Sequence, residues 1–247
     1  MIALRELKNA PIKEAVIDFR VVLKEEIETE KLDSEYSLIS NEYQKKETLL
    51  HGKFGLPFGE SEPVSKTVNP IGYRYTSGDG KYVAQFRTDG FTLSRMEPYT
   101  VWNDVRSEAA KLWEIYCRVA NVDTITRVAT RYINVIRVPM DAIKDFGEYL
   151  VCPPELPKTL PQGISSFLSR IVFRDPDIEA QCILTQALEA ADFENRLIPI
   201  ILDIDAFIER PFPVAGDHYW QEIDKLRHFK NRVFRESITD KAEGLFQ

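Results

Sequence analysis

Two glycine-containing turns in the first half of the chain constrain its fold more than any other feature of the sequence. The run Ser-Gly-Asp-Gly at 77–80 separates the segment 71–76 from 81–86, and Asp89-Gly90 separates the second segment from 91–96. An Asp-Gly pair between alternating apolar and polar runs is among the strongest local signals for a β-hairpin. The sequence therefore predicts an antiparallel meander over residues 71–97.

The segments around this meander have the patterns of a strand and of two helices. Alternate positions in 12–23 are apolar, which predicts a half-buried strand whose inner face carries Ile17, Phe19, Val21 and Leu23. Helical spacing predicts an amphipathic helix at 32–43 and a long one at 100–120, the latter with an inner stripe of Trp102, Val105, Ala109, Leu112, Trp113 and Tyr116. Between them, 47–58 is expected to be extended and 59–70 to form a surface loop.

The same order of patterns begins again at Arg127. A strand is predicted at 127–139, a short helix at 141–150, and three more strands at 164–173, 178–190 and 196–209. The closing helix, 217–235, is expected to place inward Trp220, Ile223, Leu226, Phe229 and Val233, and outward Asp224, Arg227, Asn231 and Arg235. The chain thus divides by pattern into the halves 1–122 and 123–247.

This order predicts an α+β fold of two pattern-related units, each made of a strand, a helix, three or four antiparallel strands and a long helix. Their sheets are expected to join into one extended antiparallel sheet with the helices on one face and the other face free. Arg127 and Arg131 share a side of their strand with apolar residues, which predicts a mixed surface suited to a partner. The alternative is one irregular α+β domain.

Charge and composition limit the classes of function. The 247 residues carry a formal net charge of −7, which does not suit a general nucleic-acid binder. No window approaches the roughly 18 apolar residues of a membrane helix, and charged residues near the start do not resemble a signal peptide, so we expect a cytoplasmic protein. Three cysteines without C-x-x-C spacing indicate neither a disulfide framework nor a thiolate zinc site.

Three segments carry a resemblance to a known family. They are N-A-P-I-K-E-A-V-I-D-F-R at 9–20, R-Y-I-N at 131–134, and the closing W…L…F-K-N…F-R-E-S-I-T at 220–239. With them the chain resembles a sporadically distributed bacterial family of similar length and without an established activity. The resemblance therefore implies no catalytic residue. The patchy distribution of that family suggests a mobile-element, toxin-antitoxin or phage-defence setting.

The pair Asp203 and Asp205 is the sharpest candidate for chemistry. Both carboxylates fall on one face of a predicted strand, about 7 Å apart along it. Such a pair can hold Mg²⁺ or Mn²⁺ for phosphoryl or glycosyl transfer, but a Gly-rich phosphate loop and a third carboxylate at defined spacing are both missing. The alternative is a solvated acidic strand face. Signatures of nucleophile-elbow hydrolases, P-loop NTPases and Rossmann dehydrogenases are also missing.

The closing helix holds a local basic run inside this acidic chain. Arg227, Lys230 and Arg235, with further basic neighbours, could contact RNA or a phosphate. Acidic residues interleave with them, so the alternative is an ordinary solvated helix surface.

These observations favour a non-enzymatic protein-interaction module that uses an open sheet face, such as an antitoxin, immunity or phage-defence accessory subunit. We expect a protein partner, no membrane and no cofactor, with candidate contacts at Arg127, Arg131, Arg227, Lys230 and Arg235. The first alternative is a Mg²⁺- or Mn²⁺-dependent enzyme acting on a nucleotide or nucleic acid through Asp203 and Asp205. The second is a small-molecule binder with a pocket between the sheet and the long helices, lined by Trp102, Trp113 and Trp220.

Overall fold

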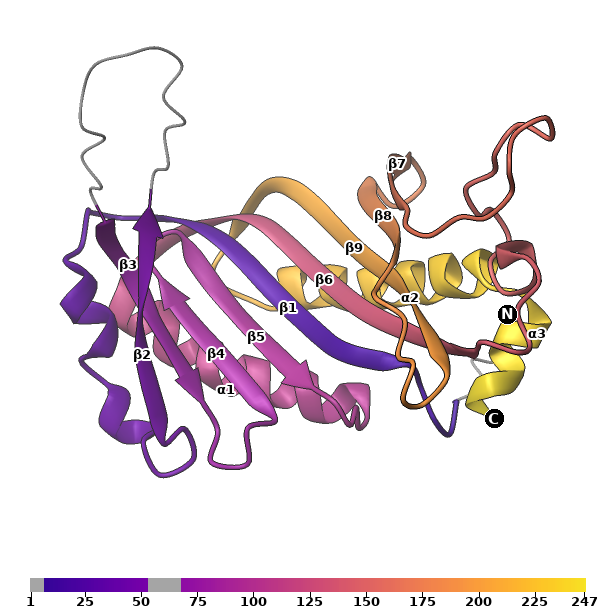
Figure 1. Cartoon of the computed structure of the whole chain (residues 1–247). Helices are drawn as coiled ribbons and strands as arrows, with labels where there is room; N and C mark the ends of the chain where they lie inside the picture. Colours follow the sequence, from indigo (N-terminus) through magenta and orange to yellow (C-terminus); the bar gives the residue numbers. More distant parts are fainter. Residues whose placement is uncertain (1–6, 53–67) are drawn as a thin grey trace, which may run out of the picture.

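The computed structural model describes residues 7–52 and 68–247, whose strands form a single open nine-stranded antiparallel sheet (Figure 1). The strand order is β2-β3-β4-β5-β1-β6-β9-β8-β7. The strands are β1 (Ile12–Leu23), β2 (Lys45–Gly52), β3 (Val68–Thr76), β4 (Tyr82–Arg87), β5 (Gly90–Met96), β6 (Val122–Pro139), β7 (Leu168–Asp175), β8 (Ala180–Leu188) and β9 (Leu197–Pro213). The α-helices are α1 (Trp102–Ala120), α2 (His218–Ser237) and the short α3 (Asp240–Glu243).

The predicted strands and their grouping agree closely with this sheet. β1 and β6 pair in the middle, with Phe19 opposite Val128. The meander β3-β4-β5 extends outward beside β1, and β7-β8-β9 extends outward beside β6. The turn at Asp89-Gly90 brings β5 against β1, where a Cβ on Gly90 would lie 2.2 Å from the Phe19 carbonyl oxygen. Glycine is therefore required at this close approach.

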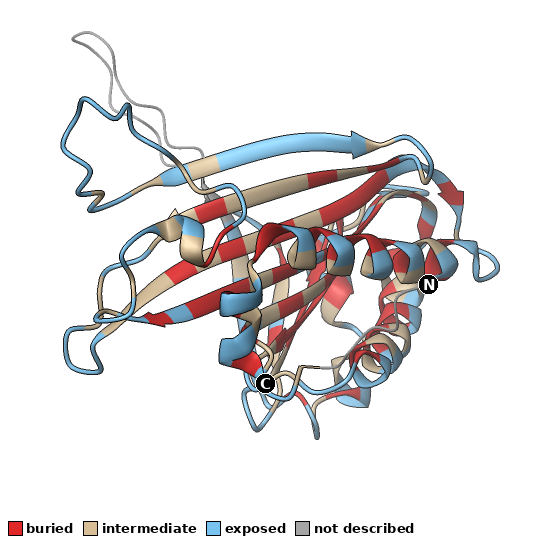
Figure 2. Ribbon diagram, turned by 90° about the vertical axis from the view of Figure 1, so that its right-hand side faces the viewer, coloured by how far each residue is buried: buried red, intermediate tan, exposed pale blue. Residues whose placement is uncertain are grey.

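The two long helices lie on one face of the sheet, behind it in Figure 1. Every residue of the predicted inner stripes of α1 and α2 is buried, as is the predicted inner face of β1 except Leu23. Aromatic side chains fill the middle of this core, and the Phe19 ring centroid lies 4.5 Å from that of Trp113 and 5.2 Å from that of Trp220. Figure 2 shows the buried residues gathered between the sheet and these helices.

Two of the predicted helices are wrong. Residues 32–43 form 3₁₀ turns at Thr29–Asp33 and Tyr36–Leu38, and 141–150 contains only the 3₁₀ turn Phe146–Glu148. Short polar side chains compete with the helical backbone at both places. Ser40 Oγ donates to the carbonyl of Ser37 at 3.2 Å, and the Asp145 carboxylate accepts from the backbone amide of Gly147 at 2.6 Å. The apolar spacing was correct in part, since Leu32, Ile39 and Tyr43 are buried.

Two further expectations concern the boundaries of the first meander and the membrane. β3 begins at Val68, so the predicted surface loop 59–70 ends earlier than expected, and its residues 59–67 lie outside the described residues. Within the ranges that the structure describes, no helix is long and apolar enough to cross a membrane.

Candidate functional site

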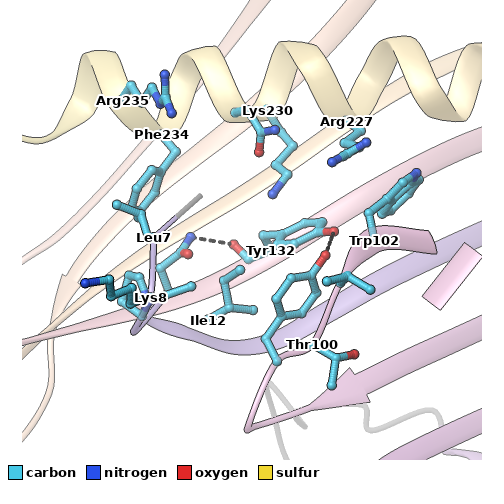
Figure 3. A pocket seen from close by; sticks show the side chains of 16 residues that line it. Leu7, Lys8, Ile12, Thr100, Trp102, Tyr132, Arg227, Lys230, Phe234 and Arg235 are labelled. Carbon is cyan, nitrogen blue, oxygen red and sulfur yellow. Dashed lines mark hydrogen bonds between the residues drawn. The ribbon is translucent and has the colours of Figure 1, made fainter. Parts of the chain in front are cut away.

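A pocket of about 670 Å³ lies on the helix side of the sheet, between α2 and β6 (Figure 3). The segment that leads into β1 and the loop that joins β5 to α1 form its other walls. Its volume is in the range of small-molecule sites. The lining residues are Leu7, Lys8, Ala10, Pro11, Ile12, Tyr99, Thr100, Val101, Trp102, Tyr132, Asn134, Arg227, Lys230, Asn231, Phe234 and Arg235.

Three segments that are far apart in the sequence meet at this pocket. They are the opening segment with Ala10, Pro11 and Ile12, the R-Y-I-N segment of β6, and the F-K-N segment of α2. These are the three segments on which the family resemblance depends. The strand β6 contributes Tyr132 and Asn134 from the side that faces the helices, because alternate residues of a strand point to the same face.

The pocket is cationic. Lys8, Arg227, Lys230 and Arg235 line it, and none of its lining residues in the described part of the chain is acidic. Within that same part, Lys8, Arg227 and Lys230 form no ion pair with a carboxylate. Other basic side chains do form such pairs, for example Arg87, Arg127, Arg131, Lys225 and Lys241. The charges of Lys8 and Arg227, which have no carboxylate partner among the described residues, give this pocket a positive potential.

Lys230 is the most unusual of these groups. The residue is only 7% exposed, and its side chain extends from α2 toward β6, with Nζ 3.0 Å from the centroid of the Tyr132 ring (Figure 3). Burial lowers the pKa of the Lys230 amine well below its ordinary value, and the positive charge of Arg227 lowers this pKa further. The structure thus keeps a buried amine in the pocket, and no carboxylate of residues 7–52 or 68–247 forms an ion pair with it.

Two phenols stand beside this amine. The hydroxyl oxygens of Tyr99 and Tyr132 lie 3.3 Å apart and share a hydrogen bond. Burial raises the pKa of both hydroxyls, so both keep their protons at neutral pH. Asn134, another lining residue on β6, donates from Nδ2 to the carbonyl of Leu202 on β9 at 2.9 Å, which holds this wall of the pocket to β9.

The outer face of α2 differs from its prediction. Asp224, Arg227, Asn231 and Arg235 are half-buried, because the start of α1 and the segment before β1 pack beside α2. Trp102 Nε1 donates to an Asp224 carboxylate oxygen at 3.0 Å, and the Arg227 guanidinium lies 5.5 Å from the Trp102 ring centroid. Asp224, the acidic residue next to Arg227 along the helix, therefore accepts a hydrogen bond from Trp102 and forms no ion pair with Arg227.

Of the three tryptophans that were predicted to line a pocket, one does so. Trp102 lines the pocket, whereas Trp113 and Trp220 belong to the core. Trp113 Nε1 donates to the hydroxyl of Tyr219 at 3.1 Å inside that core.

The other predicted contacts, Arg127 and Arg131, lie on the opposite face of β6, where they form ion pairs. Arg131 contacts both carboxylate oxygens of Asp203, at 2.9 and 2.6 Å, and Arg127 contacts both of Asp205, at 3.1 and 2.9 Å. Arg131, opposite Asp205 in the register, reaches its diagonal neighbour Asp203, whereas Arg127, opposite Glu209, reaches four residues along β9 to Asp205. The structure therefore separates the predicted site residues into two groups on two faces of the sheet.

These pairs leave Asp203 and Asp205 without free oxygen atoms directed at a metal ion. An ion bound there would have to displace an arginine from each carboxylate, and the described residues contain no cluster of three or more potential ligands. Burial raises the pKa of the Asp205 carboxyl, although Arg127 and Arg131 act in the opposite direction. The geometry is that of an ion-pair ladder.

Asp18 on β1 connects this ladder to the first half of the chain. Its carboxylate accepts from Arg127 at 3.0 Å, from Arg87 at 3.1 Å and from the Thr92 hydroxyl at 2.7 Å. Arg87 also contacts Asp89 at 3.0 Å. The side chains of Asp18 and Arg87 are 14% and 8% exposed, so this part of the face is closely packed.

The structure has all three cysteines as free thiols, and burial raises the pKa of both Cys117 and Cys182 to about 12, which keeps these thiols protonated.

No protein-family model matches the chain, and no curated protein sequence matches it significantly. The resemblance to the bacterial family therefore stays a prediction, and the site must be interpreted from its own geometry.

Arg227, Lys230, Arg235 and Trp102 were predicted from the sequence as candidate contact or lining residues, whereas the two tyrosines and the N-terminal part of the pocket were not. Lys8, Tyr99 and Tyr132 come from three separate segments and join Lys230 only in the fold. The available signal was the lysine at 230, which follows Phe229 on the buried stripe of a helix and so lies next to the core.

Proposed function

We propose that this protein binds a small anionic ligand in the pocket between α2 and β6. The observation that carries the proposal is the set of Lys8, Arg227 and Lys230 around one cavity without a carboxylate partner among the described residues. Arg227 is half-buried and Lys8 is exposed, so both charges lie where a ligand can reach them, and an anion in the cavity would offset the cost of partly desolvating Arg227. A phosphate or a carboxylate group has the charge and the hydrogen-bond acceptors that these side chains require.

Titration calorimetry with inorganic phosphate, pyrophosphate and citrate tests this proposal. We expect at least one of these anions to bind, and Arg227→Gln to weaken its binding about tenfold, which is about 1.4 kcal/mol. A charge-assisted hydrogen bond is worth about 1.5–3 kcal/mol, so the loss of one guanidinium contact is sufficient for this effect.

The matched control is Lys225→Gln on the same helix. Lys225 is exposed and pairs with Glu222 at 3.0 Å, away from the pocket lining, so its loss should leave the affinity unchanged. The proposal fails if none of the three anions binds, or if the two variants weaken binding equally.

A second proposal concerns the open face of the sheet, which we infer to bind a protein partner. Both long helices lie on the other face (Figure 1). Within the described residues, the ion-pair ladder on this face joins five carboxylates to four guanidinium groups, so it has no excess of positive charge for nucleic acid. A protein surface with complementary polar groups suits it better, as an antitoxin, immunity or defence subunit would require.

The test uses two exposed apolar positions. Val22 lies on the open face and is 51% exposed, whereas Leu38 lies in a 3₁₀ turn away from that face and is 60% exposed. We expect Val22→Glu to abolish binding of a captured protein partner, and Leu38→Glu to leave it unchanged. Equal capture by both variants would contradict an interface on the open face.

We also propose that the two halves of the chain are structural repeats. The central pair β1 and β6, each flanked by the last strand of its own half, supports this proposal, as does the long helix that ends each half.

A further inference from the structure

The amine of Lys230 has the surroundings of a nucleophile. Other lysines of the chain are placed differently: Lys46 pairs with Asp33 at 2.7 Å, Lys225 with Glu222 at 3.0 Å, and Lys241 with Glu148. Each of those lysines has a carboxylate that stabilises its ammonium form, and each is more exposed. Lys230 instead lies under α2, inside the pocket and among other cations.

A lysine attacks a carbonyl group only as the neutral amine, and desolvation or a neighbouring cation favours that form. Both conditions meet at Lys230, which is buried and has Arg227 one helical turn away on the same wall. The pocket therefore combines a buried amine whose ammonium form is disfavoured with basic side chains that can hold an anion.

We propose that Lys230 forms an imine with a carbonyl carbon of the anionic ligand, an inference that rests on the proposed binding function. The Nζ lone pair attacks the carbonyl carbon, the carbonyl π electrons move to the oxygen, and that oxygen takes up a proton as the nitrogen releases one. The hydroxyl of the resulting carbinolamine then takes up a further proton and leaves as water, the nitrogen lone pair forms the C=N bond, and the remaining N–H proton is released to give the imine. No oxidant or reductant is needed for this step.

The side chains around Lys230 bind the ligand and transfer protons. Arg227 and Lys8 bind the anionic group of the ligand, which orients its carbonyl toward the middle of the pocket. The Tyr132 ring lies against the amine, and its hydroxyl, hydrogen-bonded to that of Tyr99, can donate a proton to the departing water and recover it from solvent. The ligand class is thus an aldehyde or ketone that also carries a phosphate or carboxylate.

The experiment traps the imine on the whole chain. The protein is incubated with pyridoxal 5′-phosphate as the probe, an aldehyde with a phosphate group, and sodium cyanoborohydride converts any imine into a stable amine. Peptide mass spectrometry then locates the label. We expect Lys230 to be labelled at least about tenfold faster than the exposed Lys225 on the same helix, and excess inorganic phosphate to suppress the labelling of Lys230 alone.

The controls separate this inference from the binding proposal. Pyridoxal without the phosphate should label Lys230 more slowly, and Lys230→Arg should bind phosphate while losing the label. If phosphate binds but Lys225 is labelled as fast as Lys230, the imine is overturned and the binding function stands. If Lys230 is labelled selectively but phosphate neither binds nor competes, the binding function fails and the nucleophile stands.

Discussion

Replacing Asp18 with alanine is expected to lower the free energy of unfolding by about 3 kcal/mol. Asp18 accepts hydrogen bonds from Arg87, Arg127 and Thr92, which come from three other strands. Removing one partner of a buried ion pair typically costs about 3–5 kcal/mol, because the remaining charge stays desolvated. Arg87 keeps Asp89 and Arg127 keeps Asp205, which places the expected loss at the lower end of that range.

Urea unfolding at neutral pH measures this loss, and Glu35→Ala provides the matched control. Glu35 pairs with Arg118 at 2.8 Å, but their side chains are 34% and 52% exposed, so the pair contributes less than about 1 kcal/mol. An effect of Asp18→Ala as small as that of Glu35→Ala would show that the open face is hydrated and that its ladder does not hold β1 to β6.

The strands and the two long helices could be predicted because their signals are local. Alternation in 12–23 and the Asp89-Gly90 turn specify strands and hairpins without knowledge of the rest of the chain. The segment 32–43 shows the limit of such signals. Its apolar spacing identified buried residues, but the local hydrogen bonds of Ser40 decided against a helix.

The candidate site could not be predicted as a whole, because its parts are joined only by strand pairing. The interpretation of Asp203 and Asp205 depends on the β6–β9 register, which places Arg127 and Arg131 beside them. Without that register, a D-x-D pair has the pattern of a metal site. In the same way, Lys230 was one of several basic residues on a helix until the fold placed it over Tyr132.

Replacing Lys230 with methionine is expected to stabilise the protein by about 2 kcal/mol near neutral pH while it abolishes imine formation. Methionine fills a similar volume without the cost of desolvating an amine, and replacing buried charged groups with apolar ones can stabilise a protein by about 1–4 kcal/mol. The contact with the Tyr132 ring stabilises the ammonium form of Lys230 by only about 2 kcal/mol, which is less than the several kcal/mol that its desolvation costs.

The sign of the pH dependence follows from the lowered pKa of Lys230. Between its pKa in the folded protein and the ordinary value of about 10.4, the unfolded chain binds one more proton than the folded chain. The stability contributed by this group therefore rises with pH through that window. The groups around the amine are Arg227 and Arg235 on α2, Tyr132 on β6, Tyr99 and Lys8. The two phenols stay protonated, because burial raises the pKa of each.

Urea unfolding at about pH 6 and about pH 9 measures both effects, since these values lie on the acidic side of the ordinary lysine pKa. Lys230→Met should gain more stability over the natural chain at the lower pH, whereas Lys225→Met, at an exposed position of the same helix, should change neither the stability nor its slope with pH. A Lys230→Met protein that is less stable at both pH values would show that the ammonium is stabilised in place. Lys230 would then be a packed structural lysine, and the pocket would lose its nucleophile.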